Sequence, residues 1–279
     1  MKFAETLIIS LIFLTILSFS FLSNTADGYL HVYFLDVGQG DSLFIKTPDG
    51  KQVLIDGGPN NLVIQKLGEL MPFYDRDIDV LVITHTDSDH ITGLIEVLER
   101  YDFNLIIRSN ILCKTTLCLA LNEKIDKEEA QVWFVDSGDI LDLGHETLLN
   151  ILYPFDNNIY DGKPNNNSVV AKLNYGESSL LLTGDIEKKV ESKLFYSELD
   201  ISAKFLKIAH HGSKTSSSEL FLNTVSPSFA FIEVGDNRFG HPDEDVLARL
   251  EKRGITYYRT DKDGDIHLII DNINSYIEL

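Results

Sequence analysis

The chain is organised around one stretch, Val80-Leu81-Val82-Ile83-Thr84-His85-Thr86-Asp87-Ser88-Asp89-His90-Ile91-Thr92-Gly93-Leu94. Its apolar, β-branched beginning predicts a buried strand, and the apolar spacing from Ile91 predicts an amphipathic helix to about Tyr101. A strand fixes the backbone there, while a turn can aim side chains into a cleft. Imidazole nitrogens together with carboxylate oxygens favour zinc or manganese. The turn therefore predicts a metal site with four candidate ligands: His85, Asp87, Asp89 and His90.

The simpler interpretation of this turn is helix capping. Ser88 or Asp89 would then cap the following helix, and His85 would be an ordinary residue at the end of a strand. Capping accounts for one carboxylate at most, so the metal site is the stronger prediction.

Composition sets broad limits on fold and partners. A length of 279 residues with 44% hydrophobic residues suits one large α/β domain or two small ones. The net charge of −19 argues against nonspecific attraction to nucleic acid or anionic lipid. A bound divalent metal can nevertheless supply local positive charge for a phosphate substrate. Residues 201–262 hold nine Lys and Arg against eight Asp and Glu, so a polyanion would meet least repulsion there.

The two cysteines, Cys113 and Cys118, are close in sequence. They suit a disulfide outside the cytoplasm or two buried thiols, and they indicate no function.

The N-terminus carries a candidate localisation signal in its sequence. Residues 7–22 are apolar or small hydroxyl residues behind Lys2, a length between a signal-peptide core and a minimal membrane span. We expect residues 1–26 to be a signal peptide or an N-terminal membrane anchor, with residues 29–279 outside the cytoplasm. A buried first helix is the alternative, but such a helix should show a polar face.

Strands and helices alternate along the body. Strands are expected at 29–36, 42–47, 52–55, 80–84, 105–107, 131–135, 141–152 (broken at Gly144), 168–175, 179–185, 205–209, 229–234, 256–259 and 266–270, where the body finishes. Helices are expected at 61–70, 115–129, 186–196 and before 253–254, and 156–167 is long enough to be an active-site loop. Such alternation predicts one layered α/β domain rather than two independent ones.

Further candidate ligands stand at strand ends. Asp185 follows the 179–185 strand, where capping the next helix is its simpler role. His210 and His211 end the 205–209 strand, and His241 follows the 229–234 strand. The other histidines, His31, His145 and His267, are interpreted as structural.

Asp41 and Asp56 lie in glycine-containing turns of the first three strands. Metal-bound histidines need carboxylates that orient them, which both residues can supply. A plain turn role is the simpler interpretation from the sequence alone.

Several motifs in order, from about Leu30 to Leu268, resemble one family. They are Val37-Gly38-Gln39-Gly40-Asp41-Ser42, Leu54-Ile55-Asp56-Gly57-Gly58, the His85-to-His90 motif, Leu182-Thr183-Gly184-Asp185, His210-His211-Gly212-Ser213-Lys214-Thr215-Ser216, Arg238-Phe239-Gly240-His241-Pro242 and Tyr258-Arg259-Thr260-Asp261-Lys262-Asp263-Gly264. Together they resemble the metallo-β-lactamase superfamily, and within it the hydrolase domain of ComEC-type DNA-uptake competence proteins. The resemblance implies a single-domain αββα four-layer sandwich with metals at one edge.

Three departures from the family pattern bear on function. Asp87 replaces a histidine of the commonest first motif, and a histidine before the Gly-Asp strand is absent, where this chain has Asn165 to Ser168. We assign Asn167 and Ser168 a supporting role beside the ligands. Fewer nitrogen ligands favour manganese. Full competence proteins also carry a multi-span channel that this chain lacks, so a separate membrane channel protein is an expected partner.

The resemblance implies a metal-dependent phosphodiesterase, an extracytoplasmic nuclease related to DNA uptake, with one or two zinc or manganese ions. His85 and Asp87 would hold one ion and Asp89 and His90 the other, with Asp185 bridging and His211 completing the shell. We also expect Asp89 to act as a catalytic residue. His210, His241 and Lys214 would contact phosphate or protonate the leaving oxygen, and which of His210 and His211 binds metal stays open.

Two other functions fit the same residues. One is a degenerate, metal-stabilised module that binds DNA without cleaving it. The other is a hydrolase of small or cell-wall phosphoesters rather than DNA.

Overall fold

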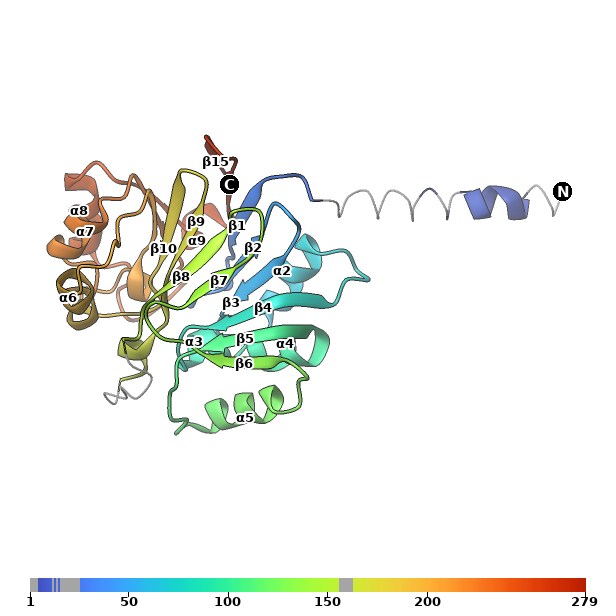
Figure 1. Ribbon diagram of the computed structural model, residues 1–279, viewed down its shortest axis with the longest axis horizontal. Helices are drawn as coiled ribbons and strands as arrows, with labels where there is room; N and C mark the ends of the chain where they lie inside the picture. Colours follow the sequence, from blue (N-terminus) through green and yellow to red (C-terminus); the bar gives the residue numbers. More distant parts are fainter. Residues whose placement is uncertain (1–4, 12, 14, 16–25, 156–162) are drawn as a thin grey trace.

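Two β-sheets form the middle of the molecule, and helices cover their outer faces (Figure 1). The computed structural model describes residues 5–11, 13, 15, 26–155 and 163–279. One apolar core lies between the two sheets, and one further core lies under each helical layer. The four-layer αββα sandwich expected from the motifs is confirmed.

The first sheet has eight strands in the order β15-β14-β1-β2-β3-β4-β5-β6. Its strands are β1 (Leu30–Phe34), β2 (Leu43–Lys46), β3 (Gln52–Ile55), β4 (Asp77–Ile83), β5 (Asp102–Arg108), β6 (Gln131–Phe134), β14 (Ile266–Ile270) and β15 (Ser275–Glu278). Helices α2 (Leu62–Leu70), α3 (Ser88–Ile91), α4 (Leu94–Arg100) and α5 (Thr116–Ile125) share a core with its outer face. Strands β1, β2 and β3 pair antiparallel in sequence, as the predicted meander requires.

The second sheet has seven strands in the order β13-β12-β11-β10-β9-β8-β7. They are β7 (Ile140–Asp142), β8 (Leu148–Tyr153), β9 (Val170–Tyr175), β10 (Ser178–Leu182), β11 (Phe205–Lys207), β12 (Phe229–Ile232) and β13 (Thr256–Arg259). Its outer core is shared with α6 (Lys188–Tyr196), α7 (Glu219–Val225) and α8 (Glu244–Lys252). The remaining short helices are η1 (Pro164–Asn167), η2 (Ala209–Gly212) and α9 (Thr260–Asp263).

Parallel pairing brings the candidate ligands to one edge of the sandwich. Strands β3 to β6 pair in parallel, and so do β10 to β13. Parallel neighbours end at the same edge of a sheet, so the residues that follow β3, β4, β10 and β11 can meet. These residues include Asp56, His85, Asp185 and His211.

The helix expected from Ile91 to about Tyr101 is two helices, α3 and α4, separated at Gly93. The backbone of Gly93 presses against the strand end, because a Cβ there would lie 2.0 Å from the carbonyl oxygen of Gly57. Helix α5 ends at Ile125, four residues before the expected end. Apolar spacing predicted the buried faces but not these interruptions, which depend on neighbours distant in sequence.

The chain does not finish at Ile270 as expected, because β15 adds an antiparallel edge strand beside β14. Helices α7 and α9 were not predicted either. Most of the predicted signal peptide or anchor, and residues 156–162 of the predicted active-site loop, lie outside the described residues. In the described part of the chain, no helix combines the length and apolarity needed to cross a membrane.

Candidate metal centre

The turn after β4 is held by Asp56, a fully buried residue that follows β3. Thr84 donates to Asp56 through its backbone N–H at 2.9 Å and through Oγ1 at 2.5 Å. His90 Nδ1 lies 2.8 Å from Asp56 Oδ2. Asp56 therefore ties together both ends of the His85-to-His90 turn, which a plain turn aspartate would not do.

Capping does not account for the acidic residues of the site. The residue at the start of α3 is Asp87, and its side chain makes no capping hydrogen bond. Helix α6 begins after Glu187, so Asp185 does not cap it. The positions of these two carboxylates are therefore not explained by helix capping.

Three buried histidines are each held through the same ring atom, Nδ1. The Nδ1 atoms of His90 and His211 are held by Asp56 and by the carbonyl oxygen of Glu233, at 2.8 and 2.9 Å. His85 Nδ1 lies 3.0 Å from Thr84 Oγ1, whose own proton goes to Asp56, so this Nδ1 donates. A histidine that donates through Nδ1 presents an Nε2 lone pair when neutral.

The Nε2 atoms of these histidines are buried and have no hydrogen-bond partner among the described residues. Asp185 Oδ2 lies 3.3 Å from Nε2 of both His90 and His211. Asp185 Oδ1 is likewise buried without a hydrogen bond. Buried polar atoms are normally satisfied, so such a convergence of lone pairs fits a bound cation. Nitrogen and carboxylate donors suit zinc or manganese.

Asp87 and Asp89 lie at the more open side of this group. Asp89 Oδ2 is 3.3 Å from His211 Nε2, and Asp87 Oδ2 is 3.8 Å from His85 Nε2. Their side chains are about one third exposed, so solvent and substrate reach the group from this side.

Burial and the neighbouring charges strongly shift the pKa values of the carboxylates and histidines in this group. Burial raises the pKa of Asp87 to about 6, with Asp89 adding to the effect. At Asp89, burial is outweighed by His211 and His90, which lower the pKa to about 2. Burial would lower the pKa of His90 and His211, but Asp185 and Asp41 raise it well above the usual value. The buried carboxylates therefore stabilise positive charge at this position.

Asp41 lies on the inner side of the histidines. It is buried, and its Oδ1 is 3.2 Å from His211 Nδ1. Asp41, His90, Asp185 and His211 each offer one ligand atom within a common 4.8 Å. Asp41 therefore lies beside the buried histidines, where it can orient them or bind a metal itself.

Two buried charged residues of this centre are not predicted from the sequence: Lys207 and Glu233. Lys207 Nζ donates to the Asp41 carboxylate and to the Gly184 carbonyl oxygen, and lies 3.7 Å from Asp185 Oδ1. Burial and the nearby Asp41 carboxylate raise the pKa of Glu233 well above its ordinary value. The available signal was a charged residue inside each of two otherwise apolar stretches expected to be strands, 205–209 and 229–234.

The histidine pair is divided by an unusual backbone. His210 and His211 both have left-handed φ values, +54° and +53°, which non-glycine residues adopt rarely and often at functional sites. His211 is buried among the carboxylates. His210 is half-buried, and its ring nitrogens lie 3.3 Å from Asn165 Nδ2 and Thr215 Oγ1. The structure brings His211, not His210, into the buried group.

The remaining candidates are spread around this group. Ser168 Oγ accepts the Asp185 backbone N–H at 3.1 Å, and Asn167 is buried nearby in sequence. The His241 ring stacks on His211 with centroids 6.4 Å apart. Burial and the neighbouring His210 lower the pKa of His241 to about 4. Lys214 is exposed, and no contact among the described residues joins its ammonium to the buried group.

Comparisons with known proteins agree with this geometry. Residues 35–157 match the family model of the metallo-beta-lactamase superfamily. "ComE operon protein 3" of Bacillus subtilis is 32% identical over 257 residues, which cover 84% of this chain and 32% of that protein. "Competence protein ComA" of Neisseria gonorrhoeae is 31% identical, over 82% of this chain and 30% of that protein. The chain thus spans about a third of the length of these curated relatives.

Solved structures show the same fold. The metallo-beta-lactamase fold protein YhfI from Bacillus subtilis has a TM-score of 0.58 at 11% identity, covering 88% of this chain and 100% of that one. Zinc-bound PqqB from Methylobacterium extorquens has a TM-score of 0.52 at 13% identity, covering 86% and 99%. The chain is therefore similar to the metallo-beta-lactamase superfamily over residues 35–157, has its fold, and resembles about a third of the length of these curated relatives.

Proposed function

We propose that this chain is a metal-dependent phosphodiesterase, a nuclease related to DNA uptake that acts outside the cytoplasm. The observation that carries the proposal is the convergence of the unpartnered Nε2 atoms of His90 and His211 on the Asp185 carboxylate, with the unpartnered Nε2 of His85 beside Asp87. A catalytic centre needs such a group at an accessible edge, and the partly exposed Asp87 and Asp89 provide the access.

The ligands divide into two sets. His85 and Asp87 form one set, supported by the 3.8 Å approach of their side chains. Asp89, His90 and His211 form the other, and we propose that Asp185, 3.3 Å from His90 and His211, is the ligand that bridges the two sets. Zinc or manganese bound here would activate a water and polarise the phosphate.

The outer residues act on the phosphodiester itself. His241 and His210 flank His211, where their rings can hold a proton for the leaving oxygen. Lys214 and the nearly neutral segment 201–262 can hold the phosphate backbone. Asp56 and Asp41 orient the histidines, and Ser168 fixes the backbone before Asp185.

The proposed setting follows from the relatives and the N-terminus. The relative from Neisseria gonorrhoeae is named a competence protein, and this chain spans about a third of its length. We propose that a membrane channel protein carries the DNA to this domain. The apolar segment within residues 1–26 supports export of the 29–279 domain, either cleaved or anchored to the membrane.

The decisive experiment compares wild type with Asp89→Ala in cleaving single- and double-stranded DNA and bis-p-nitrophenyl phosphate, with manganese or zinc. We expect wild-type turnover and a loss of roughly a hundredfold or more in the variant. Glu99→Ala, an exposed acidic change on α4, is the matched control.

Other outcomes separate the competing functions. DNA binding without turnover at any metal would favour the binding module. Turnover of the small diester without DNA cleavage would favour a small or cell-wall phosphoester. Full activity of Asp89→Ala after loss of its metal would contradict the mechanism.

A further inference from the structure

A cavity of about 650 Å³ lies between α5 and strands β5 and β6. Its lining includes no residue of the candidate metal centre. Apolar side chains form most of the wall, among them Ile111, Leu112, Leu119, Val132 and Phe134. This size and lining are typical of small-molecule sites, which add a few polar groups to an apolar pocket.

The cationic group of this cavity is Arg108, the last residue of β5. Its side chain is only 6% exposed, and no carboxylate in the described part of the chain pairs with it. Its Nε is buried without a hydrogen-bond partner, while Nη1 donates to Asn122 Oδ1 at 2.7 Å. Phe134 lies beside it, with 5.9 Å between Cζ and the ring centroid. Asp126 also lines the cavity but forms no ion pair with Arg108 in the described part of the chain, and a buried guanidinium without a directly paired carboxylate is costly, which favours an anionic ligand here.

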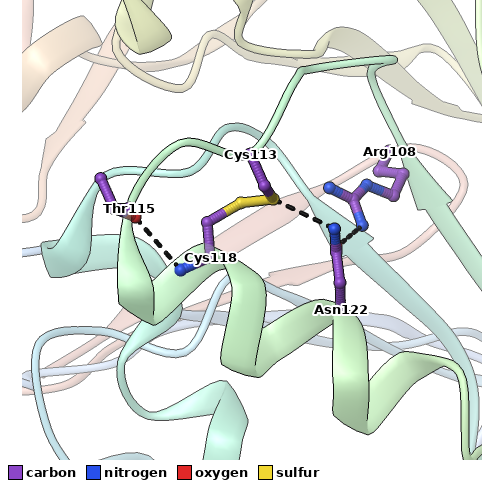
Figure 2. The surroundings of a disulfide bond; sticks show 5 residues. All are labelled: Arg108, Cys113, Thr115, Cys118 and Asn122. Carbon is purple, nitrogen blue, oxygen red and sulfur yellow. Dashed lines mark hydrogen bonds between the residues drawn. A yellow bond between two sulfur atoms is a disulfide. The ribbon is translucent and has the colours of Figure 1, made fainter.

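A disulfide fixes the wall that holds this arginine. Cys113 and Cys118 join the segment after β5 to the first turn of α5. Figure 2 shows Asn122 between the two features, donating to Cys113 Sγ at 3.2 Å and accepting from Arg108. The guanidinium is therefore held in place from the helix side before any ligand arrives.

We propose that this cavity binds a small amphipathic carboxylate, with its anionic group on Arg108 and its apolar part against the surrounding walls. Guanidinium N–H groups match the planar geometry of a carboxylate. Leu112 and Leu119 are 66% and 52% exposed at the rim, and an apolar ligand would cover them. The Asp126 carboxylate also lines the cavity, so a ligand with one negative charge is favoured over a doubly charged phosphate.

The test is calorimetric titration of the full, oxidised chain with octanoate, octanol and octyl phosphate. We expect octanoate to bind about tenfold more tightly than either of the others, because only it offers the single charge together with the apolar chain. Arg108→Met should weaken octanoate binding about tenfold or more. Arg100→Met, an exposed arginine on α4 paired with Glu96, should leave it unchanged.

A second variant keeps the proposal testable if Arg108→Met does not fold. Leu112→Glu adds a repelling carboxylate at the rim without touching the arginine, and it should also weaken octanoate binding. Leu220→Glu, at an exposed leucine on α7, is its control. No octanoate binding by folded wild type, equal binding of octanol, tighter binding of octyl phosphate, or unchanged affinity in Leu112→Glu would each overturn the proposal.

Discussion

At the scale of single residues, the centre depends on how each histidine is held from behind. His85, His90 and His211 each use Nδ1 for an internal contact, which leaves Nε2 of His90 and His211 toward Asp185 and Nε2 of His85 toward Asp87. His210 follows a different pattern, since both of its ring nitrogens face half-buried polar groups of the neighbouring loops. The adjacent residues His210 and His211 therefore have different surroundings and different expected roles.

The histidine pair offers a direct test of this division. His211→Ala should remove a buried metal ligand and lower the metal affinity by roughly tenfold to a hundredfold. His210→Ala should retain the metal and lose activity only. Metal content after dialysis, measured by mass spectrometry beside turnover, distinguishes the two. Equal metal loss in both variants would contradict the assignment.

Lys207 tests the buried charge network behind the ligands. Lys207→Met leaves the Asp41 carboxylate buried without its ammonium partner, and we expect a loss of about 3–5 kcal/mol in the free energy of unfolding. Urea unfolding measures this loss.

A second substitution serves as the control for Lys207. Adding Asp41→Asn to Lys207→Met removes the uncompensated charge and should recover part of the stability. A Lys207→Met loss below about 1 kcal/mol would show that the pair is not a stability requirement.

At the scale of secondary structure, the packing of α3 and α4 against the β3 end depends on close backbone approach. Gly93 lies between the two helices and touches the Gly57 strand end, so the metal-binding turn is seated without an intervening side chain. A methyl group there would push the turn away from the sheet edge.

A matched pair of glycine substitutions tests this packing. Gly93→Ala meets the Gly57 carbonyl oxygen and should cost about 1–3 kcal/mol or more in unfolding free energy. Gly68→Ala, inside α2 with no atom within 4 Å of the new Cβ, should stabilise by roughly 0.5–1 kcal/mol. Thermal and urea unfolding of both variants provides the comparison. Similar effects from both substitutions would refute the packing argument.

At the scale of the whole molecule, the two sheets are joined at the centre as well as through the apolar core. Asp56 and His90 come from the first sheet and its helices, whereas Asp185 and His211 follow strands of the second. A cation bound by both groups would connect the two halves and stabilise the folded chain.

Metal removal should therefore lower global stability. The chain with manganese or zinc at about one hundred times the dissociation constant should be about 2.7 kcal/mol more stable than the chain in chelator. Asp185→Asn should show a smaller gain, because it weakens the ligand between both sets. Calorimetric unfolding with and without metal measures the difference, and an equal gain in the variant would argue against Asp185 as a shared ligand.

The sequence by itself determined the layered α/β fold, most strand positions and the neighbourhood of the ligands, because apolar periodicity and strand-end motifs are local. Only the tertiary structure decided that His211 rather than His210 joins the buried group, because two adjacent left-handed residues turn their rings in different directions. Only the structure showed the partners of Lys207 and Glu233, since those partners are distant in sequence. A buried charge needs a partner of opposite charge, because an unpaired one is unfavourable away from water. Which charges are buried depends on how the two sheets pack.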